Sequence, residues 1–257
     1  MLKLETILEK IKDDDFREIF IEADEDFDFN SRNECYLLNE GDMLAYGEKN
    51  FTHKLRISDP IRVAESIYGK TNILGYRRIG DVSLFAFDGK KMRQEVNSAR
   101  AITKSIIKYS LNRIFNIGST KAPYYFEDDF LYKFSHKMRT IEIDAGSILF
   151  GHGASATKMY FIEKGIVRLS QESGNEIALI GKTECFGESA VLQGSNRSLN
   201  AEVIEDAKLT VIDAELIESE LQEETGLVQV AIFGVLRRLE FMNILRNPSH
   251  QNSKLKI

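Results

Sequence analysis

The sequence predicts an α+β protein of two tandem domains, each a β jelly-roll barrel with flanking helices. Two observations lead to this fold class: the two halves of the chain resemble each other, and in each half a group of short strands precedes the helices instead of alternating with them. Of the 257 residues 43% are hydrophobic, so each half can bury a core. We expect the first domain at residues 1–118 and the second at residues 119–257.

The first half begins with an amphipathic helix and continues as strands. Apolar residues recur at helical spacing between charges in residues 4–11. An alternating strand, a loop and a second strand follow in residues 17–43, and a further strand ends at Asp88. Residues 90–116 then carry apolar residues at helical spacing, so helices close this half.

The second half repeats this order. Residues 139–167 give an alternating strand, a loop and a second strand with Gly165 near its end, as Gly41 stands in the first half. The segment IEDAKLTVID, ending at Asp213, corresponds to IGDVSLFAFD in the first half. Residues 214–245 carry apolar residues at helical spacing. The chain therefore contains an internal repeat.

A short segment separates the two halves. Residues 118–129 (GSTKAPYYFEDD) combine Gly, Ser, Thr and Pro with an acidic cluster and break the helical pattern. We expect a helix from about Phe130 to Lys137 to open the second copy.

Charge and hydropathy exclude several classes of protein. The formal net charge is −6 and the pI is near 5.4, which is the wrong sign for a surface that neutralises phosphate backbones, so we expect no nucleic-acid partner. No apolar stretch reaches the roughly 18 residues of a membrane span, and no signal peptide is legible at the start. Cys35 and Cys185 cannot build a disulfide framework, and we expect a cytoplasmic protein.

No metal site or catalytic nucleophile is legible from spacing. The four histidines lie far apart in the sequence, which does not suit the ligand set of a metal-loaded cupin; they are His53, His136, His152 and His250. Cys185 is interpreted as a small buried hydrophobic residue. We therefore expect no metal and no enzyme.

The segment FGESAVLQGSNRSLNA, residues 186–201, has the features of an anion site. Gly187 lets the backbone approach a ligand, and the helix start after it offers unpaired N–H groups. Arg197 supplies a fixed charge suited to phosphate oxygens, with the Ser198 hydroxyl beside it. Glu188 would repel phosphate, but it can accept a hydrogen bond from a sugar hydroxyl. The set favours a ligand with a phosphate and a ribose.

On these residues, the second half resembles the cyclic-nucleotide-binding domain of catabolite activators, kinase regulatory subunits and gated channels, over about residues 130–243. The phosphate-binding cassette of that family reads Phe-Gly-Glu-Leu-Ala, a variable stretch, then Arg-Ala/Ser/Thr. FGESAVLQGSNRS departs from it at Ser189, where Leu is usual. The resemblance implies cAMP or cGMP as the regulatory ligand. It assigns the ribose 2′-hydroxyl to Glu188 and the cyclic phosphate to Arg197 and Ser198, with the cradle completed around Phe186, Gly187, Ser189 and Ala190.

The last helix carries two further expectations. The resemblance places Arg238 at a base-contacting position, although the Thr-Ser pair that follows in catabolite activators is replaced here by Met242 and Asn243. Apolar residues at alternating spacings of four and three form a heptad-like seam: Val228, Ile232, Val235, Leu239 and Met242. This seam either packs on its own barrel or makes a homodimer or an intrachain pseudo-dimer.

The first copy departs from the cassette. Ala64, Glu65 and Ser66 answer Gly187 to Ser189, and the position of Arg197 is taken by Leu74 or, aligned from the later strand, by Asn72. We therefore expect a degenerate first domain that binds no ligand, with Glu65 as a capping or solvated residue.

These observations favour a cyclic mononucleotide sensor that signals through an unidentified protein partner. Few residues follow Asn243, so we expect no helix-turn-helix. The alternative is a ligand-independent protein-interaction scaffold on the same fold. A weaker alternative is a DNA-binding regulator that uses an unrecognised element.

Overall fold

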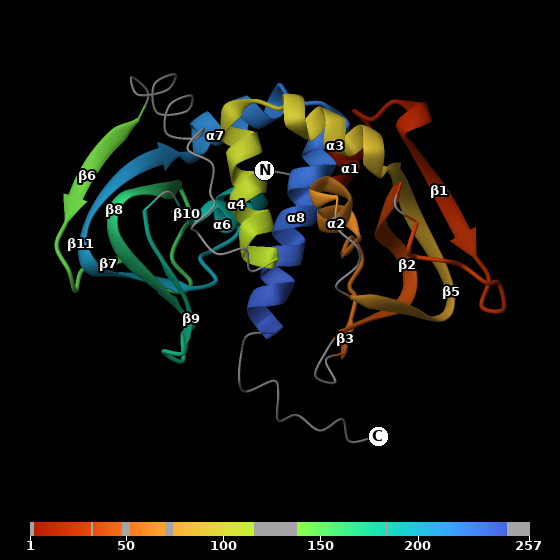
Figure 1. Cartoon of the computed structure of the whole chain (residues 1–257), viewed down its shortest axis with the longest axis horizontal. Coiled ribbons are helices and arrows are strands. Elements are labelled where there is room, and N and C mark those ends of the chain that lie inside the picture. Colours follow the sequence, from red (N-terminus) through yellow and green to blue (C-terminus); the bar gives the residue numbers. More distant parts are fainter. Residues whose placement is uncertain are drawn as a thin grey trace. The chain divides into compact units, whose positions relative to one another are not determined.

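The computed structural model shows an α+β fold with antiparallel sheets (Figure 1). It divides into two compact units, each discontinuous in sequence. Unit 1 contains residues 100–223 and 239–257, and unit 2 contains residues 3–99 and 224–238. The structure describes residues 3–31, 33–47, 52–69, 74–115, 138–182 and 184–245.

The sheet of unit 1 has six strands, all paired antiparallel and coloured green to blue in Figure 1. Its strand order is β10-β8-β11-β6, with β7 on β11 and β9 on β8. The core is apolar and includes Ile162, Val167, Phe186, Val203 and Leu209. The strands are β6 (Arg139–Ile143), β7 (Ile148–Phe150), β8 (Lys158–Ser170), β9 (Glu176–Ile180), β10 (Cys185–Phe186) and β11 (Asn200–Asp213).

Among the described residues, three complete helices belong to unit 1: α4 (Ala101–Ile114), α6 (Glu188–Gln193) and α7 (Ala214–Gln222). The short helix α6 lies between two glycines in the left-handed region, Gly187 with φ +83° and Gly194 with φ +60°. Glycine adopts such angles without the steric cost that a Cβ brings. These two residues therefore set where α6 begins and ends.

The sheet of unit 2 has five strands, in the order β1-β5-β2-β3 with β4 on β2. Its pairing is antiparallel throughout. The elements of unit 2 are α1 (Leu4–Leu8), a 3₁₀ turn (Asp13–Asp15), β1 (Phe16–Ile21), β2 (Glu34–Tyr46), β3 (Thr52–Lys54), β4 (Pro60–Ile61), α2 (Val63–Tyr68), β5 (Gly75–Asp88) and α3 (Gly89–Ser98).

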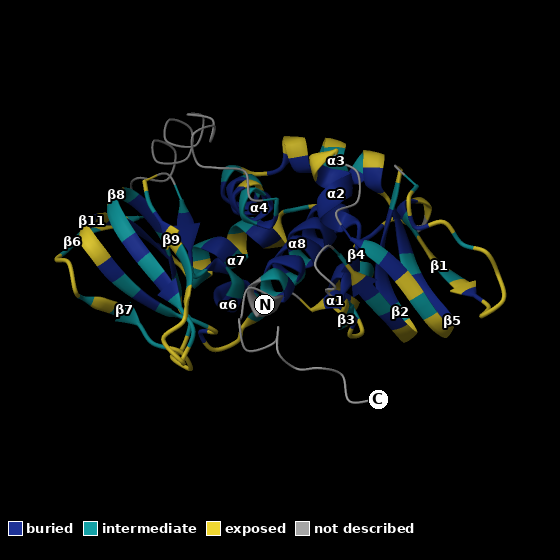
Figure 2. Ribbon diagram, turned by 60° about the horizontal axis from the view of Figure 1, so that its bottom comes forward, coloured by how far each residue is buried: buried dark blue, intermediate teal, exposed yellow. Residues whose placement is uncertain are grey.

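The last described helix, α8 (Gly226–Leu245), is buried on nearly every side (Figure 2). The expected seam residues Val228, Ile232, Val235 and Leu239 are buried, but so are apolar residues off the seam: Leu227, Val230, Ala231, Leu236 and Phe241. A helix that is apolar all round packs inside a protein rather than along one stripe. None of the helices within the described ranges is long and apolar enough to cross a membrane.

The helical regions are more divided than the sequence pattern predicts. Residues 90–116 were expected as one helical stretch, but α3 ends at Ser98 and α4 begins at Ala101, because Arg100 is extended with ψ 154°. Residues 214–245 likewise form α7 and α8. The chain passes from unit 2 to unit 1 between Ala99 and Arg100, whereas the sequence placed the domain boundary at residue 118. The predicted linker at residues 118–129 and the helix at residues 130–137 lie outside the described residues.

The two units share a strand, a left-handed residue and a short helix in that order. In unit 1 these are β10, Gly187 and α6; in unit 2 they are β4, Arg62 and α2. Arg62 has φ +65°, which is unusual for a residue other than glycine. By this order of elements, Arg62 is the residue of unit 2 that corresponds to Gly187 of unit 1. The sequence comparison had aligned Ala64 with Gly187.

Gly165 is the glycine whose substitution most directly tests the sheet of unit 1. It has φ +93°, and a Cβ there would lie 2.6 Å from the Asp206 oxygen of β11, whereas Gly174 has φ +84° and open space around it. The conformational cost at either position is about 1–2 kcal/mol. We expect Gly165→Ala to lower the free energy of unfolding at least twice as much as Gly174→Ala, measured by urea titration. Equal losses would contradict the close approach of β8 and β11.

Candidate functional site

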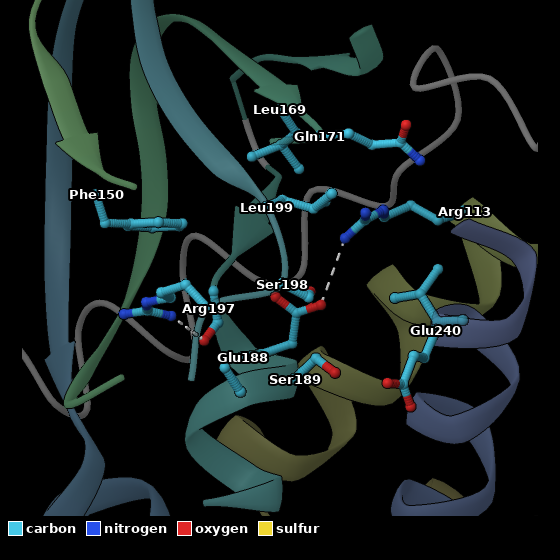
Figure 3. A pocket seen from close by; sticks show the side chains of 13 residues that line it. Arg113, Phe150, Leu169, Gln171, Glu188, Ser189, Arg197, Ser198, Leu199 and Glu240 are labelled. Atoms are coloured by element: carbon cyan, nitrogen blue, oxygen red, sulfur yellow. Dashed lines mark hydrogen bonds and ion pairs between the residues drawn. The ribbon is translucent and has the colours of Figure 1, made fainter. Parts of the chain in front are cut away.

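A cavity in unit 1 brings residues of the cassette together with residues of helices α4 and α8 and of strands β7 and β8 (Figure 3). It lies at the start of α6 and includes the loop that leads from α6 into β11. The residues that line it are Arg113, Phe150, Leu169, Gln171, Gly187, Glu188, Ser189, Ala190, Arg197, Ser198, Leu199, Leu239 and Glu240.

Arg197 is fixed in place by backbone carbonyls. Its residue is only 4% exposed, Nη1 donates to the Gly187 oxygen at 2.7 Å, and Nη2 donates to the Lys158 oxygen. The Arg197 backbone is also held, since its N–H donates to Ala154 at 2.9 Å and its oxygen accepts from Gly153 at 2.8 Å. The guanidinium is therefore preorganised before any ligand arrives.

The same guanidinium lies on an aromatic floor. Its Cζ is 4.1 Å from the centre of the Phe150 ring, a cation–π distance. Behind Phe150, Phe186 stacks on Tyr160 with ring centres 5.2 Å apart. This floor explains the place of Phe186, which is fully buried in the core and supports the site from below instead of lining the cavity.

Within the described part of the chain, no carboxylate serves as counter-ion to the positive charge of Arg197. The buried Nε of this guanidinium has no hydrogen-bond partner among the same residues. Burial lowers the pKa of Arg197, an effect that Tyr160 and Glu188 partly oppose. A buried cation without a partner costs several kcal/mol. An anionic ligand in the cavity would offset that cost.

Gly187 makes room for this guanidinium. A Cβ at Gly187 would lie 2.7 Å from Arg197 Nη1, and φ +83° disfavours any other residue. The sequence analysis expected Gly187 to let the backbone approach a ligand; in the structure, the group that lies against Gly187 is the Arg197 guanidinium. Because α6 has only six residues, the charge of Arg197 matters more for anion binding than the dipole of this helix.

Glu188 is buried and paired with a residue outside the cassette. It is 3% exposed, and its Oε1 lies 3.4 Å from Arg113 Nη1 in the last turn of α4, drawn as a dashed line in Figure 3. Among the described residues, Glu188 and Arg197 do not form an ion pair with each other. Both residues are buried, and the partner of Glu188 is Arg113.

The other predicted site residues divide into two groups. Ser189, Ala190 and the exposed Ser198 line the cavity with Gly187, Glu188 and Arg197. Arg238 does not line it: the side chain is buried in unit 2, where Nη2 lies 3.8 Å from Glu65 Oε1. From α8 the cavity instead receives Leu239 and Glu240. The base contact that the resemblance implied for Arg238 therefore has no counterpart in this cavity.

Glu65 differs from its predicted role. It is 1% exposed and pairs with Arg238, so it is neither solvated nor free to cap α2, whose N-terminus has no side-chain cap. Burial of both partners explains the difference, since a carboxylate that leaves water needs a cation nearby. Asn72, one candidate for the position of Arg197 in the first copy, lies outside the described residues.

Sequence reasoning missed several lining residues. Phe150, Leu169 and Leu199 supply apolar walls that no motif marks, and Glu240 brings a second carboxylate whose buried Oε2 has no hydrogen-bond partner. Arg113 was missed because it stands in the first half of the sequence. One signal was available: Arg113 occupies in α4 the place that Arg238 occupies in α8.

The cavity of unit 1 thus combines a buried, anchored arginine with a buried carboxylate at the start of a short helix. A comparison with protein families matches residues 140–224 to the cyclic nucleotide-binding domain. The chain thus contains a cyclic nucleotide-binding domain in these residues, and all six cassette residues that line the cavity fall within it.

Similar proteins share only part of this chain or a distant fold. The putative potassium channel protein RPA4233 of Rhodopseudomonas palustris is 31% identical over 91 residues, which are 34% of this chain and 22% of the channel protein. The cAMP-bound EAL enzyme Bd1971 is 28% identical over 41% of this chain and 29% of its own, with a TM-score of 0.39. The chain spans less than a third of either protein.

A third similar structure extends over most of the chain. The cAMP-bound PfPKA-R (141-441) is 15% identical, covers 85% of this chain and 82% of its own, and has a TM-score of 0.36.

The described residues hold no group of three side chains suited to a metal ion, and both cysteines are free and buried. Burial raises the pKa of Cys35 to about 12 and raises that of Cys185, beside the site, well above its usual range. Only the thiolate is an effective nucleophile. This agrees with Cys185 as a packing residue.

We expect neither Cys35 nor Cys185 to react with iodoacetamide at pH 8 while the protein is folded. A raised pKa leaves almost no thiolate at that pH, and burial excludes the reagent. Mass spectrometry should show both thiols labelled in 8 M urea, which serves as the control. Labelling of Cys185 in the native protein at the rate seen in urea would contradict its burial.

Proposed function

We propose that unit 1 binds a cyclic mononucleotide, cAMP or cGMP, and that the chain is a sensor without enzymatic activity. The observation that carries this proposal is the buried, preorganised and uncompensated charge of Arg197 inside a matched cyclic nucleotide-binding domain. A phosphate diester supplies the missing negative charge and oxygens that accept from the guanidinium.

The remaining groups of the cavity fit the rest of such a ligand. Glu188 offers a carboxylate to ribose hydroxyls, and Ser198 stands at the rim beside Arg197. Leu239 and Glu240 provide an apolar contact and an acceptor for the base. A carboxylate accepts from the amino group of adenine and from the N1–H and amino group of guanine, so these residues leave both bases open.

Unit 2 is proposed to be a degenerate copy that binds no nucleotide. Arg62 stands where unit 1 has Gly187, and its buried side chain donates to the Phe29 oxygen at 3.2 Å. The buried Glu65 carboxylate lies 3.8 Å from the buried Arg238 guanidinium. Both features favour a packed interior over an open cradle.

The output of the sensor is proposed to leave by contact with a protein partner in the cytoplasm, with the chain acting as a pseudo-dimer or a homodimer. α4 and α8 both contribute residues to the cavity, so an occupied cavity can favour one arrangement of these helices. A ligand shifts such an equilibrium only by its differential affinity, typically about 1–3 kcal/mol.

Arg197→Ala is expected to weaken nucleotide binding by on the order of 3–5 kcal/mol, because the bound phosphate loses its buried charged partner. This corresponds to about two to three and a half orders of magnitude in Kd. Competition with a fluorescent cAMP analogue measures it.

The matched control is Arg168→Ala, which removes a β8 arginine whose side chain is 39% exposed and pairs with Glu202. That variant should bind as the parent does, since exposed pairs contribute little. An Arg197→Ala protein with the parent's affinity would reject the site. A parent that binds no cyclic nucleotide would favour the ligand-independent scaffold.

A further inference from the structure

The cavity is completed by a residue that the cyclic nucleotide-binding match does not contain. Arg113 lies in α4, and the match begins only at residue 140. In the sequence, α4 follows the strands of unit 2, yet it belongs to the compact unit that holds the cavity. The site of unit 1 therefore depends on the helical segment that follows the other copy's barrel.

The same exchange occurs in unit 2. Arg238 of α8, which follows the strands of unit 1 in the sequence, belongs to unit 2 and approaches Glu65 of the short helix α2. Each short helix thus carries a buried glutamate that faces an arginine from the helix encoded after the other set of strands. The positions differ slightly, since Glu188 opens α6 whereas Glu65 is the third residue of α2.

The pair in unit 1 is well placed to control the carboxylate that faces a ligand. Both side chains are shielded, with 11% of Arg113 and 4% of Glu188 exposed. Arg113 approaches Oε1, and no described residue donates to Oε2. Figure 3 shows the Glu188 carboxylate between Arg113 and Arg197. One oxygen is held by α4 while the other stays available.

We propose that Arg113 is a positioning residue of the nucleotide site: it holds Glu188 through Oε1, so that Oε2 can accept a hydrogen bond from the ribose 2′-hydroxyl. This inference rests on the proposed function. A buried carboxylate keeps its charge and orientation only with a partner, and hydrogen bonds to a charged acceptor are the strong ones. Recognition of the ribose is therefore supplied in part by α4, and this ties occupancy of the cavity to that helix.

The test compares cAMP with 2′-deoxy-cAMP on the full chain. For the parent, we expect Kd for the deoxy analogue to exceed Kd for cAMP by about 10- to 100-fold, as a hydrogen bond to a charged group implies. In Arg113→Met that ratio should fall about tenfold, with the affinity for the deoxy analogue nearly unchanged. Arg113→Lys, which keeps the charge, should recover part of the ratio.

Two further variants make the test specific to the pair. Lys108→Met removes an exposed cation of the same helix and should leave both affinities unchanged. Adding Glu188→Gln to Arg113→Met should lower the ratio no further than Glu188→Gln alone, because the two residues act together. Melting curves of all variants report folding, and Arg113→Lys serves if Arg113→Met does not fold.

The outcomes separate this inference from the proposed function. If the parent binds cAMP and Arg113→Met weakens both ligands equally, the role of Arg113 is packing and the inference is overturned. Tighter cAMP binding by Arg113→Met would also overturn it, since Arg113 would then compete with the ligand. If the parent binds neither cAMP nor cGMP, the proposed function fails and the inference fails with it.

Discussion

The arrangement of the site depends on one buried guanidinium, that of Arg197, whose charge is neutralised by no carboxylate among the residues that the structure describes. Arg197 is anchored by the carbonyls of Gly187 and Lys158 and lies on the Phe150 ring. These contacts fix the orientation of the guanidinium, but carbonyl oxygens and an aromatic ring carry only partial negative charge. Much of the local structure follows from this side chain: the glycine it lies against, the aromatic floor beneath it, and the loop between α6 and β11 that carries it.

The second constraint is the distribution of the site over the chain. The cradle is local, because β10, α6 and the start of β11 follow one another closely. The residues that face it come from α4 and from the end of α8, far apart in sequence. Under the proposed function, a bound nucleotide would contact residues of both helices, and the pair of Glu188 and Arg113 would link the cassette to α4.

Sequence reasoning found the local part of the site and not the remainder. The spacing from Gly187 to Arg197 is carried by one short segment, so motif and structure agree there. Arg238 and Glu65 could not be placed, because their environment is set by the compact unit that α8 joins. The strands could be predicted from the alternation of apolar and polar residues and from the glycines Gly41 and Gly165. The break at Arg100, where the chain changes units, has no glycine or proline to announce it.

The most direct test of the central claim is a calorimetric titration of the full chain with cAMP and with cGMP, read as sites per chain. The cavity of unit 1, with Arg197 beside Glu188, predicts one site per chain for at least one of the two nucleotides. Two sites per chain would show that unit 2 also binds. No binding at ligand concentrations up to about 1 mM, which corresponds to about 4 kcal/mol of affinity, would contradict the assignment of Arg197 to a cyclic phosphate.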